Sequence, residues 1–323
     1  MTTRIAVSVL VVIAASGGVS AQEKRAFEVS DYYRTAFVGA PEISPDGLRV
    51  AVAVTRYELE KGESWSGVWM MGSHGGNPRQ MTQGRHHDSN PTFSPDGSLL
   101  AFESDRAGDQ TQLFVMPVDG GEPRQLTDVP TGVADAVWSP DGRFVAVASH
   151  VYPECGSDAD CNETIRKAVE KGPLKAYMSD ELLYRHWNGW REGRYPHVLL
   201  VDAATGKVLR DLTPGRWDSP TFALGGGPGY AFSPDSRELC FTSNRDPVPA
   251  TSTSSDLWCG SVRPAPVREV FDEASRSRIA RSTRSLPCSM RVLRGVARSV
   301  AARPMILHVL QELAVPGRMG LVA

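Results

Sequence analysis

The chain has 323 residues, enough for one large domain or two ordinary ones. Hydrophobic residues make up 41% and charged residues 22%, which is typical of a soluble globular protein rather than a fibrous or disordered one. The formal net charge is −2, so the chain as a whole is not a strongly basic protein that would bind nucleic acid through its charge.

The N-terminus predicts a secretory signal peptide over residues 1–21. An apolar run over residues 5–15 is followed by the small residues 19–21, Val-Ser-Ala, which form a cleavage site of the usual kind. The run is too short to span a membrane comfortably. We therefore expect a mature chain that begins near Gln22, is periplasmic or secreted, and has no membrane span after cleavage. An uncleaved anchor is the alternative.

One sequence pattern then occurs four times: an apolar strand, Ser-Pro-Asp, and a second apolar strand. Its serines are Ser44, Ser94, Ser139 and Ser233, so the copies lie 50, 45 and 94 residues apart. Self-similarity at this period indicates stacked units of supersecondary structure. Proline presets φ at the first corner of each turn, and the Asp side chain bonds back to its own backbone.

A second hairpin follows the first in each complete unit, as in residues 68–82 and 113–127. Four antiparallel strands in a unit of this length make one propeller blade. We therefore expect an all-β fold, a β-propeller over residues 22–258 built of four-stranded antiparallel blades. The blades are predicted near residues 41–82, 91–127, 136–213 and 230–258. The fourth blade is incomplete in this prediction, and about four blades leave an open ring with unpaired sheet edges.

The third unit is long because residues 151–196 stand between its second and third strands. Part of this insertion, residues 162–171, predicts a helix that is capped by Asp160 or Asn162 and ends at Gly172. The third blade therefore carries a partly helical insertion.

Five cysteines leave one over if they pair. Cys155 and Cys161 lie in one polar loop of the insertion and predict a small disulfide in an oxidising compartment. A metal site is the alternative, but no His or further Cys stands near them. Cys240 lies on a predicted strand, where we expect a buried small apolar residue.

These features together resemble the N-terminal propeller of the prolyl oligopeptidase family of serine peptidases. The Ser-Pro-Asp-Gly blades and the Gly-Gly-x-Pro-Arg-x-Leu-Thr hairpins carry the resemblance, which covers about residues 27–258. Residues 181–193 (ELLYRHWNGWREG), followed by residues 197–215, are similar to the acylaminoacyl-peptidase and dipeptidyl-peptidase branch.

The resemblance implies a gate. In that family the propeller caps a C-terminal α/β-hydrolase domain that carries Ser, Asp and His, and it admits only short or unstructured peptides. Peptides are therefore the expected partners, through a hydrolase domain that this chain lacks. TolB-like periplasmic propellers use the same Ser-Pro-Asp-Gly repeat, so a standalone propeller that binds protein partners is the alternative.

The chemistry of an α/β-hydrolase needs a G-x-S-x-G nucleophile turn, and the sequence contains none. The nearest stretch, residues 62–67, has Ser66 where the second Gly would stand. His86, His87 and Asp88 could ligate a metal, but adjacent side chains on an extended chain point opposite ways, which favours a solvated loop. We therefore predict no catalytic residue, no metal and no cofactor, and a chain that is inactive alone.

Candidates for contact with substrate are Arg185, His186, Trp187 and Trp190 of the insertion. Aromatic and charged groups that reach a space between propeller and hydrolase would bind peptide. The equally weighted alternative is that they pack the insertion onto the third blade. Neither interpretation gives them a catalytic role.

Residues 259–323 differ sharply from the rest of the chain. They contain 11 Arg, no Lys and 4 acidic residues, or +7, so the remainder carries −9. Residues 290–303 can be drawn as a basic amphipathic helix, suited to an anionic membrane or nucleic acid. Because the blade pattern stops directly after Trp258, we favour out-of-frame translation of a GC-rich coding sequence and expect an irregular tail with no nucleic-acid partner. The downstream nucleotide sequence, searched in all three frames for G-x-S-x-G, tests this hypothesis.

Overall fold

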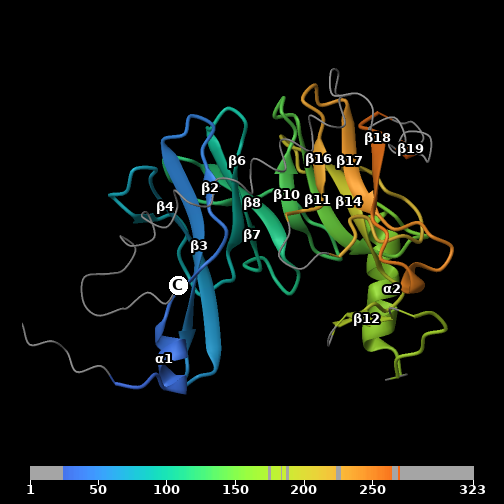
Figure 1. The fold of residues 1–323 in the computed structure, drawn as a ribbon, viewed down its shortest axis with the longest axis horizontal. Coiled ribbons are helices and arrows are strands. Elements are labelled where there is room, and N and C mark those ends of the chain that lie inside the picture. The colour runs from blue at the N-terminus through green and yellow to red at the C-terminus, as the bar shows by residue number, and fades with distance from the viewer. Residues whose placement is uncertain are drawn as a thin grey trace, which may run out of the picture.

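The computed structural model describes residues 25–173, 176–182, 184–186, 189–222, 227–263 and 268–269. In this part of the chain four antiparallel sheets follow one another in sequence order (Figure 1). The predicted all-β propeller of four-stranded blades is confirmed.

The strands of each sheet are consecutive apart from the insertion in the third. The first sheet contains β1 (Phe37–Val38), β2 (Glu42–Ile43), β3 (Arg49–Glu58), β4 (Glu63–Gly72) and β5 (Arg79–Gln80). The second contains β6 (Ser89–Phe93), β7 (Leu99–Ser104), β8 (Gln112–Pro117) and β9 (Arg124–Gln125). The third contains β10 (Ala134–Trp138), β11 (Phe144–Val151), β14 (Tyr195–Asp202) and β15 (Val208–Asp211). The fourth contains β16 (Tyr230–Phe232), β17 (Glu238–Ser243), β18 (Asp256–Ser261) and β19 (Arg268–Glu269).

The repeated Ser-Pro-Asp turn closes the first hairpin of every sheet in the same way. In the second sheet, the Ser94 hydroxyl donates to Asp96 at 2.6 Å and accepts the backbone N–H of Leu99 at 2.9 Å. The hydrogen bond from Ser94 is the main reason why the pKa of Asp96 is lowered. The fourth copy has Ser236 where the others have Gly, at φ 58°, and its hydroxyl accepts the backbone N–H of Asp141 at 3.1 Å. This serine therefore ties the third and fourth turns together.

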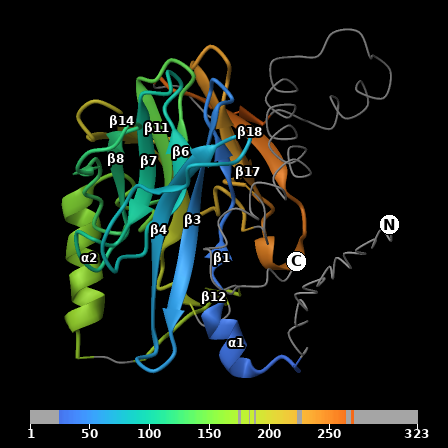
Figure 2. The ribbon, with the colours of Figure 1, turned by 90° about the vertical axis from the view of Figure 1, so that its left-hand side faces the viewer.

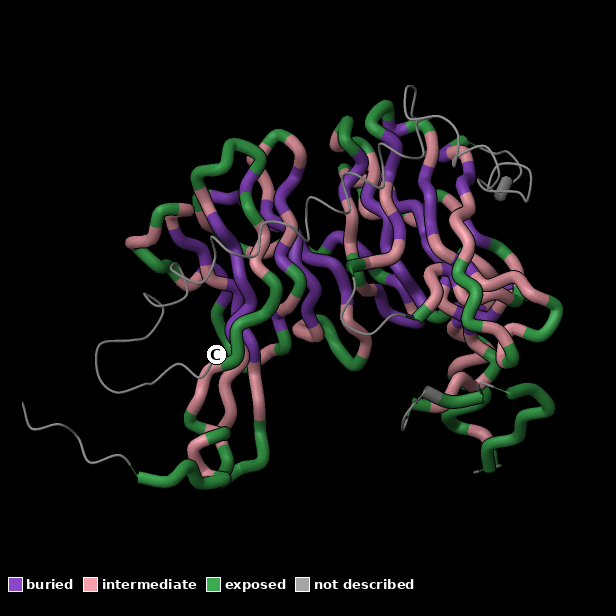
Figure 3. Tube along the Cα trace, in the orientation of Figure 1, coloured by how far each residue is buried: buried purple, intermediate pink, exposed green. Residues whose placement is uncertain are grey.

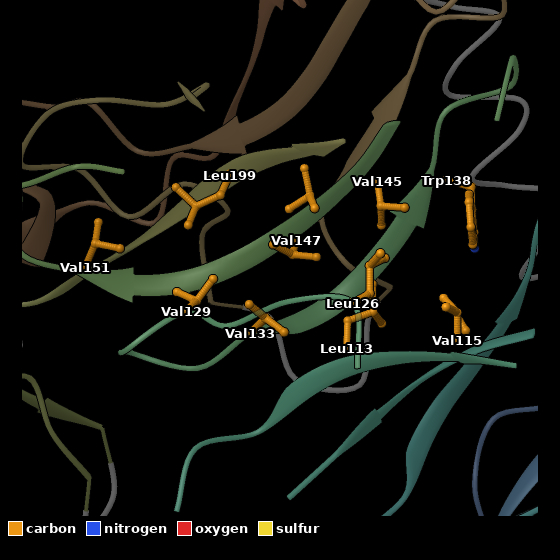
Figure 4. Packing of buried hydrophobic residues seen from close by; sticks show 12 residues of the cluster. Leu113, Val115, Leu126, Val129, Val133, Trp138, Val145, Val147, Val151 and Leu199 are labelled. Atoms are coloured by element: carbon orange, nitrogen blue, oxygen red, sulfur yellow. The ribbon is translucent and has the colours of Figure 1, made fainter. Parts of the chain in front are cut away.

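The core lies between successive sheets. An aromatic side chain just before the repeated Ser packs against the preceding sheet in the last three units: Phe93, Trp138 and Phe232. Figure 4 shows Trp138 at one edge of a cluster of valines and leucines from the second and third blades. Burial of such side chains supplies most of the energy that holds one blade on the next.

The described sheets form an open arc, not a closed ring. Neighbouring sheets pack in chain order, β3 on β6, β6 on β10 and β10 on β16, and the first and fourth sheets lie at opposite ends (Figure 1). The first unit has Ile43 at the position of Phe93, and its exposed fraction is 42% against 5% for Phe93. Ile43 is exposed because no earlier blade is described for it to pack against.

Two α-helices accompany the sheets in the described part of the chain. Helix α1 (Val29–Arg34) precedes the first sheet, and α2 (Ala159–Lys171) belongs to the insertion; α1 lies at the bottom of Figures 1 and 2, and α2 lies near the lower end of the third sheet in Figure 1. The predicted start of α2 was three residues late, because its cap is Asp158, whose carboxylate accepts the N–H of Cys161 at 3.0 Å. Gly172 follows the helix as predicted. The described helices include none that is long and apolar enough to cross a bilayer.

The fourth blade corrects the sequence prediction. We expected the pattern to stop after Trp258, yet β18 continues to Ser261 and β19 pairs with it, Cys259 opposite Arg268. Backbone hydrogen bonds join β19 to β18, so this pairing needs no apolar pattern in the sequence. The predicted boundary of the Arg-rich tail at residue 259 is therefore wrong. The signal peptide and residues 290–303 lie outside the described part of the chain.

Candidate functional site

A cavity of about 1000 Å³ lies between loops of the third and fourth blades. Three segments line it: part of the insertion between Tyr177 and Tyr195, residues 216–222 after β15, and residues 244–255 between β17 and β18. The third and fourth sheets hold these segments side by side. Residues 216–222 follow the last strand of the third sheet, residues 244–255 follow the second strand of the fourth, and both lie at the same end of these neighbouring blades. The last segment contains a 3-10 turn, Pro249–Thr251.

A stack of aromatic rings forms one wall. The strands β12 (Arg185–His186) and β13 (Gly189–Trp190) make a small hairpin that presents Trp190. The Trp190 ring is parallel to that of Tyr177 at 4.2 Å between centroids, and Tyr184 lies at 5.5 Å. The guanidinium of Arg185 is 5.9 Å from the Trp190 ring, close enough for a weak cation–π contact.

The four predicted contact residues therefore have different outcomes. Trp190 lines the cavity, and Arg185 lies beside its ring. Trp187 and the side chain of His186 lie outside what the structure describes. Sequence reasoning missed Tyr177 and Tyr184, although Tyr184 directly precedes Arg185 and Tyr177 lies only eight residues before it.

Ion pairs fix the base of the cavity to the third blade. Arg191 donates to both carboxylate oxygens of Asp218 at 2.8 Å, and its guanidinium lies 4.5 Å from the Tyr195 ring. Glu181 accepts the hydroxyl of Tyr195 at 3.0 Å and Arg216 at 3.4 Å. Such bidentate Arg–carboxylate pairs hold a defined geometry. The cavity wall is thus anchored to β14 and to the segment after β15.

The rim is apolar and open to solvent. Side chains of the insertion and of the two loops stand well exposed around the opening: Met178, Leu182, Phe222 and Val248. Figure 3 shows the exposed insertion below the buried strands of the third and fourth sheets. Exposed apolar side chains gathered around a concave site are a common mark of a binding surface.

Two disulfides lie in this half of the molecule. Cys155 and Cys161, the predicted pair, are joined with their Cα atoms 5.5 Å apart, and the bond fastens the first turn of α2 to the loop before it. Cys240 is buried as expected, but it is bonded to Cys259 of β18, directly opposite it in the sheet. The prediction of a simple apolar residue was wrong because residue 259 was assigned to the tail.

The His86–Asp88 stretch has a structural role. The Asp88 carboxylate, 1% exposed, accepts Arg106 through both oxygens at 2.8 and 2.7 Å. His87 Nδ1 lies 2.7 Å from Asp105. Among the described residues no group of three or more potential ligands could hold a metal ion.

One buried carboxyl lies between blades. Glu103 of β7 accepts the backbone N–H of Asp135 at 2.6 Å and the side-chain amide of Asn90 at 3.0 Å. Burial raises its pKa to about 7, and the nearby Asp135 adds to the shift. The hydroxyl of Tyr230 donates to the backbone oxygen of Asp135. This polar network therefore connects the second, third and fourth blades.

Comparisons with known proteins identify the class. The family model described as PD40, TolB beta propeller domain, matches residues 23–156. The fold matches acylaminoacyl peptidase from Pyrococcus horikoshii with a TM-score of 0.54 and 14% identity, over 75% of this chain and 33% of that one. Residues 23–156 therefore match a TolB-type β-propeller domain, and the chain shares its fold with part of that peptidase.

Sequence relatives then specify the kind of propeller. The chain is 31% identical over 236 residues to the uncharacterized peptidase YuxL of Bacillus subtilis, covering 73% of this chain and 34% of that protein. It is 28% identical over 222 residues to dipeptidyl-peptidase 5 of Porphyromonas gingivalis, covering 67% and 31%. It spans about a third of the length of these relatives. The predicted resemblance is confirmed: the chain is a relative of the propeller part of prolyl oligopeptidase-type peptidases.

Proposed function

We propose that the chain is the substrate-gating propeller of an exported serine peptidase of the prolyl oligopeptidase family. The observation that carries the proposal is the cavity built by the insertion, with its aromatic wall and apolar rim. In this proposal peptides reach a separate α/β-hydrolase domain through that face, and the propeller has no hydrolytic activity of its own.

The size and walls of the cavity suit a short extended peptide. A volume of about 1000 Å³ is at the upper end of sites that enclose small ligands, and it is far smaller than a folded domain. Trp190 and Tyr177 offer flat apolar surfaces on which the side chains of a peptide can pack. These features select by conformation: a flexible segment fits and a folded chain does not.

Export is part of the proposal. Two disulfides in the described residues are expected of a protein that matures in an oxidising compartment. The apolar run over residues 5–15 supplies the expected signal. Mass spectrometry of the protein from the periplasm or medium should find a chain beginning near Gln22. A cytosolic chain that starts at Met1 and has free thiols would contradict export.

Peptide binding is tested with N-acetyl-Ala-Ala-Phe amide by calorimetry. Trp190→Ala should weaken binding about tenfold, because it removes the centre of the aromatic stack. Trp65→Ala is the matched control, since Trp65 stacks with Arg85 at 4.4 Å in the distant first sheet. If the wild type and the Trp190 variant bind the peptide with equal affinity, the cavity is not the peptide-binding site.

The alternative is a standalone TolB-like propeller that binds protein partners. The match of the TolB propeller model to residues 23–156 favours it. A stably folded monomer with a specific protein partner, whose binding is unchanged by Trp190→Ala, would support this second function against the first.

A further inference from the structure

Arg245 is a partly buried cation without a carboxylate partner in the described residues. It lies in the loop after β17, with its guanidinium 4.1 Å from the Trp258 ring and 5.7 Å from Phe241. Its Nε and Nη2 atoms are buried and have no hydrogen-bond acceptor. Burial lowers its pKa, and no neighbouring carboxylate offsets that effect.

Arg106 occupies the same place in the second blade. Each arginine stands two positions after the last serine of the second strand, Ser104 or Ser243. Each also lies over the facing aromatic pair of its own blade; for Arg106 the distances are 5.1 and 5.3 Å. Arg106, however, has its charge paired with Asp88, to both of whose carboxylate oxygens Nη2 donates, and it donates from Nε to Ser104 at 2.9 Å. The repeat thus shows what this arginine binds when a carboxylate is present.

The fourth blade has a serine in place of that carboxylate. Ser104 donates to Asp88 at 2.6 Å, and the corresponding Ser243 is hydrogen-bonded to Ser219 at 2.9 Å. Ser219 is fully buried, as Asp88 is. A single neutral hydroxyl cannot pair with both arms of a guanidinium, so Arg245 keeps an uncompensated charge.

The unpaired arginine adjoins the cavity. Asp218 and Asn244, the residues that directly precede Ser219 and Arg245, both line it. Arg245 itself is partly buried rather than fully enclosed. Asp218, the carboxylate next to Ser219 in the chain, is already paired with Arg191.

We propose that the cavity binds peptides through a carboxylate, either the C-terminus or an acidic side chain, that pairs with Arg245. A carboxylate matches the planar fork of a guanidinium and supplies the partner that Asp88 supplies to Arg106. This inference rests on the peptide-binding role proposed above and names the chemical group that the site selects.

The test compares three peptides by calorimetry on the purified chain. They are N-acetyl-Ala-Ala-Phe with a free carboxylate, its C-terminal amide, and the amide of N-acetyl-Ala-Glu-Phe. The free acid should bind at least about tenfold more tightly than the amide. Arg245→Gln should remove that difference, whereas Arg237→Gln, at an exposed arginine in the turn between β16 and β17 outside the cavity lining, should keep it. If the Glu peptide binds as tightly as the free acid, an acidic side chain can also supply the carboxylate that pairs with Arg245.

A second variant protects the result against a folding defect. Ser219→Asp places a carboxylate where Asp88 stands in the second blade, so it should raise the melting temperature and abolish the preference for the free acid. Equal binding of acid and amide by the wild type overturns the inference but leaves the peptide-binding role standing. Absence of binding by all three peptides overturns both. A preference for the acid that survives Arg245→Gln in a folded variant also overturns the inference.

Discussion

Glu103→Gln should change how the stability of the protein depends on pH. Glu103 is 4% exposed, and burial raises its pKa to about 7 from an ordinary value of 4.5. The native state therefore holds a proton between about pH 4.5 and 7 that the unfolded chain has released. The free energy of unfolding must fall as pH rises through that window, because the folded state binds more protons there.

The size of the effect follows from the pKa difference. About 2.5 units, at 1.36 kcal/mol each, correspond to about 3 kcal/mol lost between pH 4.5 and pH 8. A neutral glutamine has no such loss. Its oxygen can still accept the N–H of Asp135, and a turned Asn90 amide can accept its NH₂ group. Near pH 4.5 the two proteins should therefore be similar, and at pH 8 the variant should be more stable.

Urea denaturation at pH 4.5, 6 and 8, followed by circular dichroism, measures this difference. Glu122→Gln, at an exposed position of the second blade, is the matched control and should run parallel to the wild type at every pH. The burial argument fails if the wild type and Glu103→Gln keep a constant difference from pH 4.5 to 8. It also fails if the variant is less stable at pH 8.

Two further stability predictions follow from the polar and covalent links. Asp88→Asn should lower the free energy of unfolding by about 3–5 kcal/mol in chemical denaturation, because it leaves Arg106 buried and unpaired. A loss below about 1 kcal/mol would show that the pair is not what holds this loop. Replacing Cys240 and Cys259 together by Ala should cost about 3 kcal/mol, since their bond closes a loop with a sequence separation of 19. A melting temperature unchanged by the double substitution, and insensitive to reductant, would mean that the bond does not form.

The blades could be predicted because the information in each is local. Pro-Asp turns and alternating strands define a unit within one stretch of sequence, whichever units surround it. The fourth blade misled the prediction because β19 pairs with β18 through its backbone, and its two residues, Arg268 and Glu269, have no apolar pattern that the sequence would reveal. The cysteine pair could nevertheless have been predicted from the repeat. Cys240 follows its repeat serine by seven positions, as Ala101 does. Ala101 lies opposite Val115 in the second sheet, and Cys240 lies opposite Cys259 in the fourth. Extending the repeat alignment by one strand would have found the bond.

The cavity could be predicted only in part. Trp190 was found because the insertion has an unusual composition, but two of the three lining segments are ordinary polar loops. Their approach depends on how the third and fourth sheets stack. The same holds for Arg245. The sequence shows that Arg245 and Arg106 follow the serine of the second strand by the same number of residues. Asp88, however, precedes its repeat serine by 6 residues and Ser219 precedes its own by 14. Only the structure shows that Asp88 and Ser219 occupy equivalent positions.

The central claim is that this propeller binds peptides but does not cleave them. A hydrolysis assay tests it most directly. The purified chain is incubated with a dipeptidyl p-nitroanilide and an N-acetylaminoacyl p-nitroanilide, at a concentration that binds N-acetyl-Ala-Ala-Phe amide. We predict binding of the peptide amide and no release of p-nitroaniline above the buffer blank. Release that rises in proportion to the chain and stops with a serine-reactive inhibitor would contradict a gate that depends on a separate catalytic domain.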